Sequence, residues 1–217
     1  QKSDMATLEL NGKSLATQTS SAEPVIASTV TGGAGLSGMT SLGTVTAGNL
    51  SNTAIVYPAG HVVQVVNNIY NSSSSDSNTS GTLVRFGVSS TYHWKGTINN
   101  VGASNHVIVI MSFCFEMYKA STGVAGGGCG IMRDTDGAGT GLTTILEPKT
   151  HSNWIDISAS NTMDMYDQKT LHFVDTSPAT GTNVYYLAGK QHSSSALYVH
   201  STSAFEPFSC TLMEIQR

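Results

Sequence analysis

The side chains most able to carry out chemistry are carboxylates, and their spacing along the chain completes no catalytic set. Four of them lie close together in the sequence, namely Asp156, Asp164, Asp167 and Asp175. Glycoside hydrolysis needs two carboxylates held at a fixed separation, which such loose spacing does not specify. The serine-nucleophile pattern Gly-x-Ser-x-Gly does not occur. We therefore expect no enzymatic activity.

Two aspartates in the stretch Asp134-Thr-Asp-Gly-Ala-Gly-Thr140 resemble the start of a calcium loop. The stretch lacks the third acidic position and the closing bidentate Glu, so Asp134 and Asp136 make an incomplete calcium site. The alternative is a turn in which these carboxylates accept backbone hydrogen bonds. The seven histidines form no His-x-His or His-x3-His pair. We expect no resident metal and no cofactor.

The three cysteines, Cys114, Cys129 and Cys210, are an odd number with no close pair. This pattern predicts neither a disulfide framework nor a zinc site and favours folding in a reducing cytoplasm. Cys114 and Cys210 lie in apolar stretches, which indicates small core residues. Cys129 lies in the glycine run 126–130, where we expect it to be accessible.

Aromatic side chains in polar surroundings are the stronger candidates for a binding role. Flat aromatic faces beside Asn, Ser and Asp can hold sugars or a protein partner. The alternative is that about half of the aromatic side chains fill the core. We expect Trp94 and Trp154 to be exposed because turn residues flank them. The candidates for partner or receptor contact are Tyr92, Trp94, Trp154 and Tyr198.

The composition excludes two classes of partner. The net charge is −4 and the ten Lys and Arg residues are scattered, so we expect no nucleic-acid binding, which needs clustered cations. No run of about 18 apolar residues occurs, and we expect no insertion into a membrane. Charged residues make up 11% of the chain, against about 25% in ordinary domains. Ser, Thr, Asn and Gly take their place.

Apolar residues alternate with polar ones at the period of a β-strand, and helical periodicity is nearly absent. Short strands separated by turn-rich segments predict an all-β fold, an antiparallel sandwich or barrel. The turn-rich segments are 71–80, 123–130, 134–141, 175–182 and 190–195. The expected strands are 61–66, 83–88, 107–118, 171–174, 183–188, 196–199 and 209–215.

The longest apolar run, 107–118, is the expected central strand. Its second half places Met111, Phe113, Phe115 and Met117 on one face. Its first half is apolar on both faces, although a sandwich core covers only one face of a strand. The second face then needs another layer, either a second subunit or a covering loop. The interface candidates are therefore Val107, Ile108, Val109 and Ile110.

The N-terminal part differs in composition. The glycine-rich segment 31–38 cannot bury a core. Before it, Leu8-Glu-Leu-Asn-Gly-Lys13 indicates a strand and a turn, and after it the stretch 42–48 is short and β-prone. We therefore expect residues 1–56 to form an extended arm or attachment segment. The sandwich domain is expected over residues 57–217.

Four stretches of the sandwich domain resemble one family. They are Tyr57-Pro-Ala-Gly-His-Val-Val-Gln-Val-Val66, Phe173-Val-Asp-Thr-Ser-Pro178, Tyr185-Tyr186 and Cys210-Thr-Leu-Met-Glu-Ile215. They resemble the virion structural and tail-fibre-type proteins of tailed bacteriophages, particularly those of marine bacteria. The resemblance implies a jelly-roll-like head domain that assembles as a homotrimer, with the N-terminal part docking onto other virion proteins. No catalytic residue is carried over.

The resemblance implies a virion protein, assembled in the host cytoplasm, for particle assembly or adhesion to host glycan or protein. The short N-terminal segment and the lack of a long fibre shaft depart from the tail-fibre pattern. They admit a second possibility, a trimer that decorates a capsid. A carbohydrate-binding module or polysaccharide depolymerase is the alternative from another class.

Overall fold

The computed structural model describes twelve segments of the chain. They are residues 7–11, 13–17, 25–26, 59–70, 74–87, 94–100, 102–120, 122–148, 153–157, 162–193, 196–201 and 207–217. The chain divides into two compact units, residues 1–55 and residues 56–217. Each unit is described by itself below.

The first unit contains a small antiparallel sheet with the strand order β1-β2-β3. Its strands are β1 (Thr7–Leu10), β2 (Lys13–Thr17) and β3 (Val25–Ile26). Asn11, between β1 and β2, has a φ of 51°, a left-handed conformation that Asn tolerates better than most residues. The strand and turn expected around Leu8 are thus present. The segment 31–38 lies outside the described residues, and the attachment role stays a prediction.

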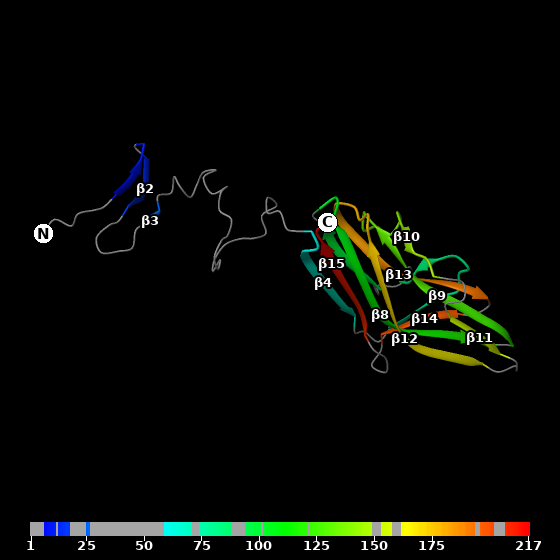
Figure 1. Ribbon diagram of the computed structural model, residues 1–217. Helices are drawn as coiled ribbons and strands as arrows, with labels where there is room; N and C mark the ends of the chain where they lie inside the picture. The colour runs from blue at the N-terminus through cyan, green and yellow to red at the C-terminus, as the bar shows by residue number, and fades with distance from the viewer. Residues whose placement is uncertain are drawn as a thin grey trace. The chain divides into compact units, whose positions relative to one another are not determined.

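The second unit is a β-sandwich of two antiparallel sheets with six strands each, as predicted for the fold class. The first, here called the β8 sheet, has the order β4-β15-β8-β14-β5, and β12 pairs with the other edge of β8 (Figure 1). Its strands are β4 (Val62–Tyr70), β5 (Ser74–Asn78), β8 (His106–Lys119), β12 (Met163–Asp175), β14 (Ala196–Ser201) and β15 (Phe208–Ile215).

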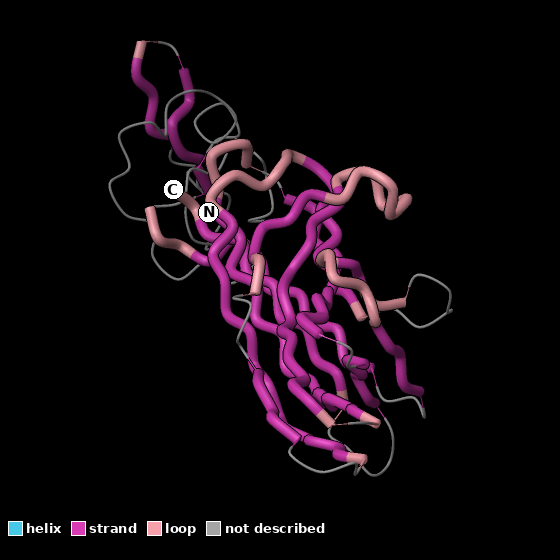
Figure 2. Tube along the Cα trace, turned by 90° about the vertical axis from the view of Figure 1, so that its right-hand side faces the viewer, coloured by secondary structure: helices cyan, strands magenta, loops and turns pink. Residues whose placement is uncertain are grey.

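The second sheet, here called the β9 sheet, has the order β10-β9-β13-β6, with β11 pairing β9 and β7 pairing β13. Its strands are β6 (Val84–Arg85), β7 (Lys95–Asn100), β9 (Gly123–Asp134), β10 (Thr143–Leu146), β11 (Asn153–Ile157) and β13 (Gly181–Ser193). Figure 2 shows only strands and loops over the described residues. Within these residues, no helix is long and apolar enough to cross a membrane.

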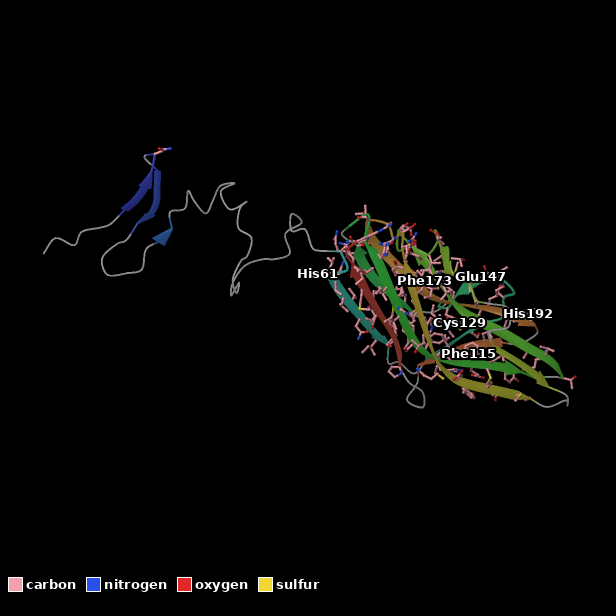
Figure 3. The ribbon with its side chains drawn as sticks, in the orientation of Figure 1. His61, Phe115, Cys129, Glu147, Phe173 and His192 are labelled. Atoms are coloured by element: carbon pink, nitrogen blue, oxygen red, sulfur yellow. The ribbon has the colours of Figure 1, made fainter. Side chains whose placement is uncertain are left out.

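The core lies between the inner faces of the two sheets. Met111, Phe113, Phe115 and Met117 of β8 are each 0% exposed, which confirms the face predicted for them. Figure 3 labels three of the side chains that build this core, Phe115 of β8, Phe173 of β12 and Cys129 of β9. Burial of such apolar side chains is the main favourable term in folding the sandwich.

A buried polar group links the two sheets at the end of β12. Asp175 of β12 accepts hydrogen bonds from the Arg133 guanidinium of β9 at 2.5 Å and from the Tyr185 hydroxyl of β13 at 2.9 Å. Burial and the Asp175 carboxylate raise the pKa of Tyr185. The phenol therefore stays protonated and keeps donating, and the carboxylate is paired in spite of its burial.

Strand β8 changes partners along one of its edges. β12 pairs with it from Val107 to Lys119, whereas the opposite edge pairs with β15 up to Ser112 and with β14 from Cys114 onward. The outer face of the β8 sheet, turned away from the core, therefore has two halves. We call them the β15 half, over β4, β15, residues 106–112 of β8 and residues 170–175 of β12, and the β14 half, over β5, β14, residues 114–119 of β8 and residues 163–168 of β12.

Some segments predicted to be turns are strands. The glycine run 126–130 lies inside β9, and the packing leaves no room for a Cβ at Gly127 and Gly130. A Cβ on Gly127 would lie 2.8 Å from Leu197 Cδ2 and 2.8 Å from the Lys190 carbonyl oxygen. β5 lies inside the predicted turn segment 71–80, and β13 extends to Ser193, into the predicted turn segment 190–195. The sequence analysis predicted no strand at β7, β10 or β11.

Candidate functional site

The β15 half of the outer face carries a row of apolar side chains across four strands. The strand register places Val65 of β4 opposite Met213 of β15, Met213 opposite Ile108 of β8, and Ile108 opposite Val174 of β12. Val65 is 57% exposed and Val174 is 39% exposed, while Met213 and Ile108 are half-buried. We call these four residues the apolar row.

Further apolar surface adjoins this row on the same sheet. Ile69 of β4, which is 62% exposed, shares the outer face with Val65 four residues earlier. Half-buried Ile110 lies next to Ile108 on β8, between His172 and Thr211 of the flanking strands. Such contiguous exposed apolar surface is typical of an interaction site rather than of scattered surface hydrophobes.

The β14 half carries a different set of side chains. Phe115 faces the core, so alternation places its neighbour Glu116 on the outer face, opposite Tyr166 of β12 and Tyr198 of β14. The next outward position of β8 is Tyr118. With His200 of β14, these residues form what we call the aromatic cluster: Glu116, Tyr118, Tyr166, Tyr198 and His200.

The rings of the aromatic cluster contact one another across three strands. Tyr198 and His200 are stacked with centroids 6.0 Å apart, and Tyr118 meets Tyr198 edge to face at 6.5 Å. Tyr166 lies 6.0 Å from the His200 ring in a tilted arrangement. These separations lie within the range of favourable aromatic pairs. The cluster is therefore one connected surface and not a set of isolated rings.

A histidine–carboxylate pair lies at the centre of the cluster. His200 Nε2 and Glu116 Oε2 are 2.5 Å apart, and the two side chains are only 11% and 10% exposed. Tyr166 is 50% exposed. Desolvation, followed by the charges of Glu116 and Asp164, raises the pKa of Tyr166, and Glu116 also accepts a hydrogen bond from its hydroxyl. The Tyr166 phenol is thus held protonated at the surface.

The structure corrects one of the four predicted contact residues and locates another. Trp94 is 2% exposed and meets Phe208 edge to face at 5.5 Å, so its predicted exposure is wrong: it fills the core at the start of β7. Tyr198 lies in the aromatic cluster. Tyr92 lies outside the described residues. Trp154 belongs to β11, but its side chain is not among those described.

The four interface candidates of β8 separate by face. Val107 and Val109 are 0% exposed and belong to the core, so naming them for a subunit interface was wrong. Ile108 and Ile110 alternate with them and lie on the outer face, in and beside the apolar row. The second apolar face of 107–110, for which the sequence predicted a covering layer, is thus the outer face that bears these two isoleucines.

Asp134 and Asp136 form a turn that is held by backbone amides. The Asp134 carboxylate accepts hydrogen bonds from the amides of Asp136 at 3.1 Å and Gly139 at 2.5 Å, and Asp136 accepts one from Ala138 at 2.7 Å. Burial alone would raise the pKa of Asp134, but these hydrogen bonds lower it. Among the described residues, no three His, Cys, Asp or Glu side chains gather as metal ligands.

The cysteines are held as thiols. Burial raises the pKa of Cys210 to about 12 and that of Cys129 further still. Cys129, expected to be accessible, is half-buried and packs against the core. Cys210 is buried in the core, as predicted, whereas Cys114 is buried on the outer face of the β8 sheet, opposite Gln168 and His200. Thiolates are the reactive form of cysteine, so these side chains act in packing.

The sequence did not predict the aromatic cluster, although it predicts the outward orientation of some of its side chains. The alternation along β8 places Glu116 and Tyr118 outward. The missing information was the pairing between strands: Tyr166, Glu116 and Tyr198 are far apart in the sequence and are brought into one row by register alone.

Comparison with models of known protein families, and with curated protein sequences, finds no match for this chain.

Proposed function

We propose that this chain is a non-enzymatic structural protein of a bacteriophage virion, whose sandwich associates with further copies of itself and presents an adhesive surface. The virion assignment rests on the sequence resemblance described above. The apolar row across β4, β15, β8 and β12 carries the self-association. A row this wide on a sheet face gains stability only when a second surface excludes water from it.

Self-association through the β15 half has a simple energetic basis. Fully burying one side chain of the size of Val, Ile or Met contributes about 1.5–3 kcal/mol. Val65, Val174 and the adjacent Ile69 are exposed enough to gain much of this on association. Few ionic groups occupy this half, so little charge must be desolvated when copies meet. We propose three copies, as the resemblance implies.

Light scattering of the full-length protein at micromolar concentration tests this proposal. A homotrimer of the 22.7 kDa chain has a mass of about 68 kDa, and this is the expected result. A monomer at that concentration would overturn self-association. Mass spectrometry of purified virions tests the location separately, because a virion protein must be present there in stoichiometric amounts.

One observation keeps the capsid-decorating trimer as a second candidate. The chain divides into two compact units, which suits a protein that ties neighbouring capsid subunits with its first unit while the sandwiches trimerise. Locating the chain in a density map of the particle separates the two candidates, since one requires the tail and the other the capsid surface.

A further inference from the structure

We propose that the aromatic cluster on the β14 half is a binding site for a neutral saccharide. This inference rests on the proposed function, whose adhesive part it makes specific. It assigns the two halves of one sheet face to different partners: copies of the chain on the β15 half, and a sugar on the β14 half.

The shape of the aromatic cluster suits a sugar ring. Sugar rings present flat faces of weakly positive C–H groups, which pack against the negative face of an aromatic ring. Tyr166 is 50% exposed, and it lies with Tyr198 and His200 in one connected set of rings. β12 and β14 flank β8, so Tyr166 and Tyr198 stand two strand spacings apart, about 9.5 Å. That distance spans about two pyranose rings.

Hydrogen-bonding groups lie beside the rings of the aromatic cluster. Saccharide sites combine apolar faces with a few fixed polar groups that set the orientation of the ligand. Here the Tyr166 hydroxyl donates a hydrogen bond to Glu116, which is also in contact with His200. Exposed Gln168 and Ser77 lie at the ends of neighbouring rows, on β12 and β5. Hydroxyl, amide and carboxylate groups together can donate to and accept from sugar hydroxyls.

Negative charge at the aromatic cluster favours neutral saccharides over anionic ones. Glu116 lies within the cluster, and exposed Asp164 is opposite Tyr118 in the register. Two carboxylates at the site repel a uronic acid or a sialic acid, whereas a neutral sugar avoids this cost. Quaternary ammonium ions also bind to tyrosine faces, but they need rings that surround one point. Here Tyr198 and His200 are stacked at an interplanar angle of 22°.

The strands that carry the aromatic cluster hold it rigidly. The cluster is built on three hydrogen-bonded strands and not on loops, and β8 is paired along both edges at this point. The His200–Glu116 contact further fixes the central side chains. A site on rigid elements loses little conformational entropy on binding, which is what weak single-sugar contacts require.

The experiment is an NMR titration of the full-length protein with defined disaccharides. Lactose, cellobiose and diacetylchitobiose are the neutral probes, a hyaluronan disaccharide is the anionic probe, and choline is the cationic probe. We expect at least one neutral disaccharide to shift signals of the β14 half, and the anionic probe and choline to leave them unchanged. Binding of the anionic probe or choline alone, or of no probe, overturns the inference.

Variants place the site. Tyr166→Ala should weaken binding of the neutral disaccharide by about tenfold, because its exposed ring supplies a stacking face, and Tyr166→Phe should restore most of the loss. Ile69→Ala, an exposed apolar substitution on the other half of the same face, is the matched control and should leave binding unchanged. Equal effects of Tyr166→Ala and Ile69→Ala would overturn the assignment.

Light scattering on the same samples keeps the two proposals apart. A trimer that binds no neutral sugar refutes the saccharide site and leaves the proposed function standing. A monomer that binds a neutral disaccharide through Tyr166 refutes self-association and leaves the saccharide site standing.

Discussion

The two halves of the outer face of the β8 sheet share strands β8 and β12 and differ in almost every side-chain property. The β15 half presents aliphatic groups from Val65, Met213, Ile108 and Val174, aligned in one row. The β14 half presents tyrosines around a histidine–carboxylate pair. The boundary falls where β8 exchanges β15 for β14 as its partner. A partner change in a sheet thus separates two surfaces without any break in the strand.

The side chains of each half determine what that half can bind. Aliphatic side chains offer no hydrogen bonds, so they select partners by area and shape, as protein interfaces do. Tyrosines with a buried polar pair beneath them offer both stacking and directed hydrogen bonds, which suits a small polar ligand. If this contrast is right, substitutions in the two halves must have different effects on self-association, stability and ionisation.

The largest effect is expected from a charge placed in the apolar row. Val65→Glu should weaken self-association at least about 100-fold, because an unpaired carboxylate would be desolvated at the interface. Sedimentation equilibrium measures the change. The melting temperature of the diluted protein should stay within about 2 °C of that of the parent, as is usual for an exposed position.

Gln168→Glu is the matched control for this charge. Gln168 is exposed on the outer face of β12 but lies in the β14 half, so the same added charge should leave self-association unchanged. If both variants dissociate the protein equally, the effect is one of net charge and the contrast between the halves fails.

An intermediate effect is expected within the aromatic cluster. A double-mutant cycle on Glu116→Ala and His200→Ala should give a coupling of about 1–3 kcal/mol in the free energy of unfolding, since both partners are nearly buried. The comparison cycle is Ser112 and Thr170, whose hydroxyls are 2.9 Å apart on the exposed surface. That pair should couple by less than about 0.5 kcal/mol. Chemical denaturation measures both, and equal couplings would contradict the contrast.

The smallest effect concerns the ionisation of one phenol. Because desolvation and Glu116 raise the pKa of Tyr166, its hydroxyl should be less ionised at pH 10 than a free tyrosine, which is about half ionised there. The ultraviolet titration of the parent minus that of Tyr166→Phe isolates this group. Glu116→Gln should lower the midpoint, since it removes a negative charge that opposes the phenolate. A midpoint at or below that of free tyrosine would contradict the arrangement.

Alternation within strands made much of the fold predictable. It gave the all-β class, the central position of β8, and the inward face from Met111 to Met117. It failed where glycine and serine suggested turns. β9 needs glycine because Leu197 and the Lys190 carbonyl approach its backbone closely, a packing requirement that composition alone cannot distinguish from flexibility.

The candidate site was less predictable than the fold. Flanking turn residues suggested exposure for Trp94, but its neighbours in space, Phe208 among them, come from the other end of the chain. The sequence shows that 107–110 is apolar on both faces. The structure adds that Val107 and Val109 face the core while Ile108 and Ile110 face outward. Register between distant strands is what single-sequence patterns do not contain.

The position of β15 has a consequence for how the protein is made. The last strand of the chain lies between β4 and β8, and Gln64 bonds to Glu214 across 150 sequence positions. The β8 sheet therefore cannot close until β15 has been synthesised, and contacts of such long range form slowly. A chain that stops before Phe208 leaves β4 and β8 with open edges, which readily pair with foreign strands. Native folding, and entry into any assembly built on this sheet, therefore requires a chain that includes β15.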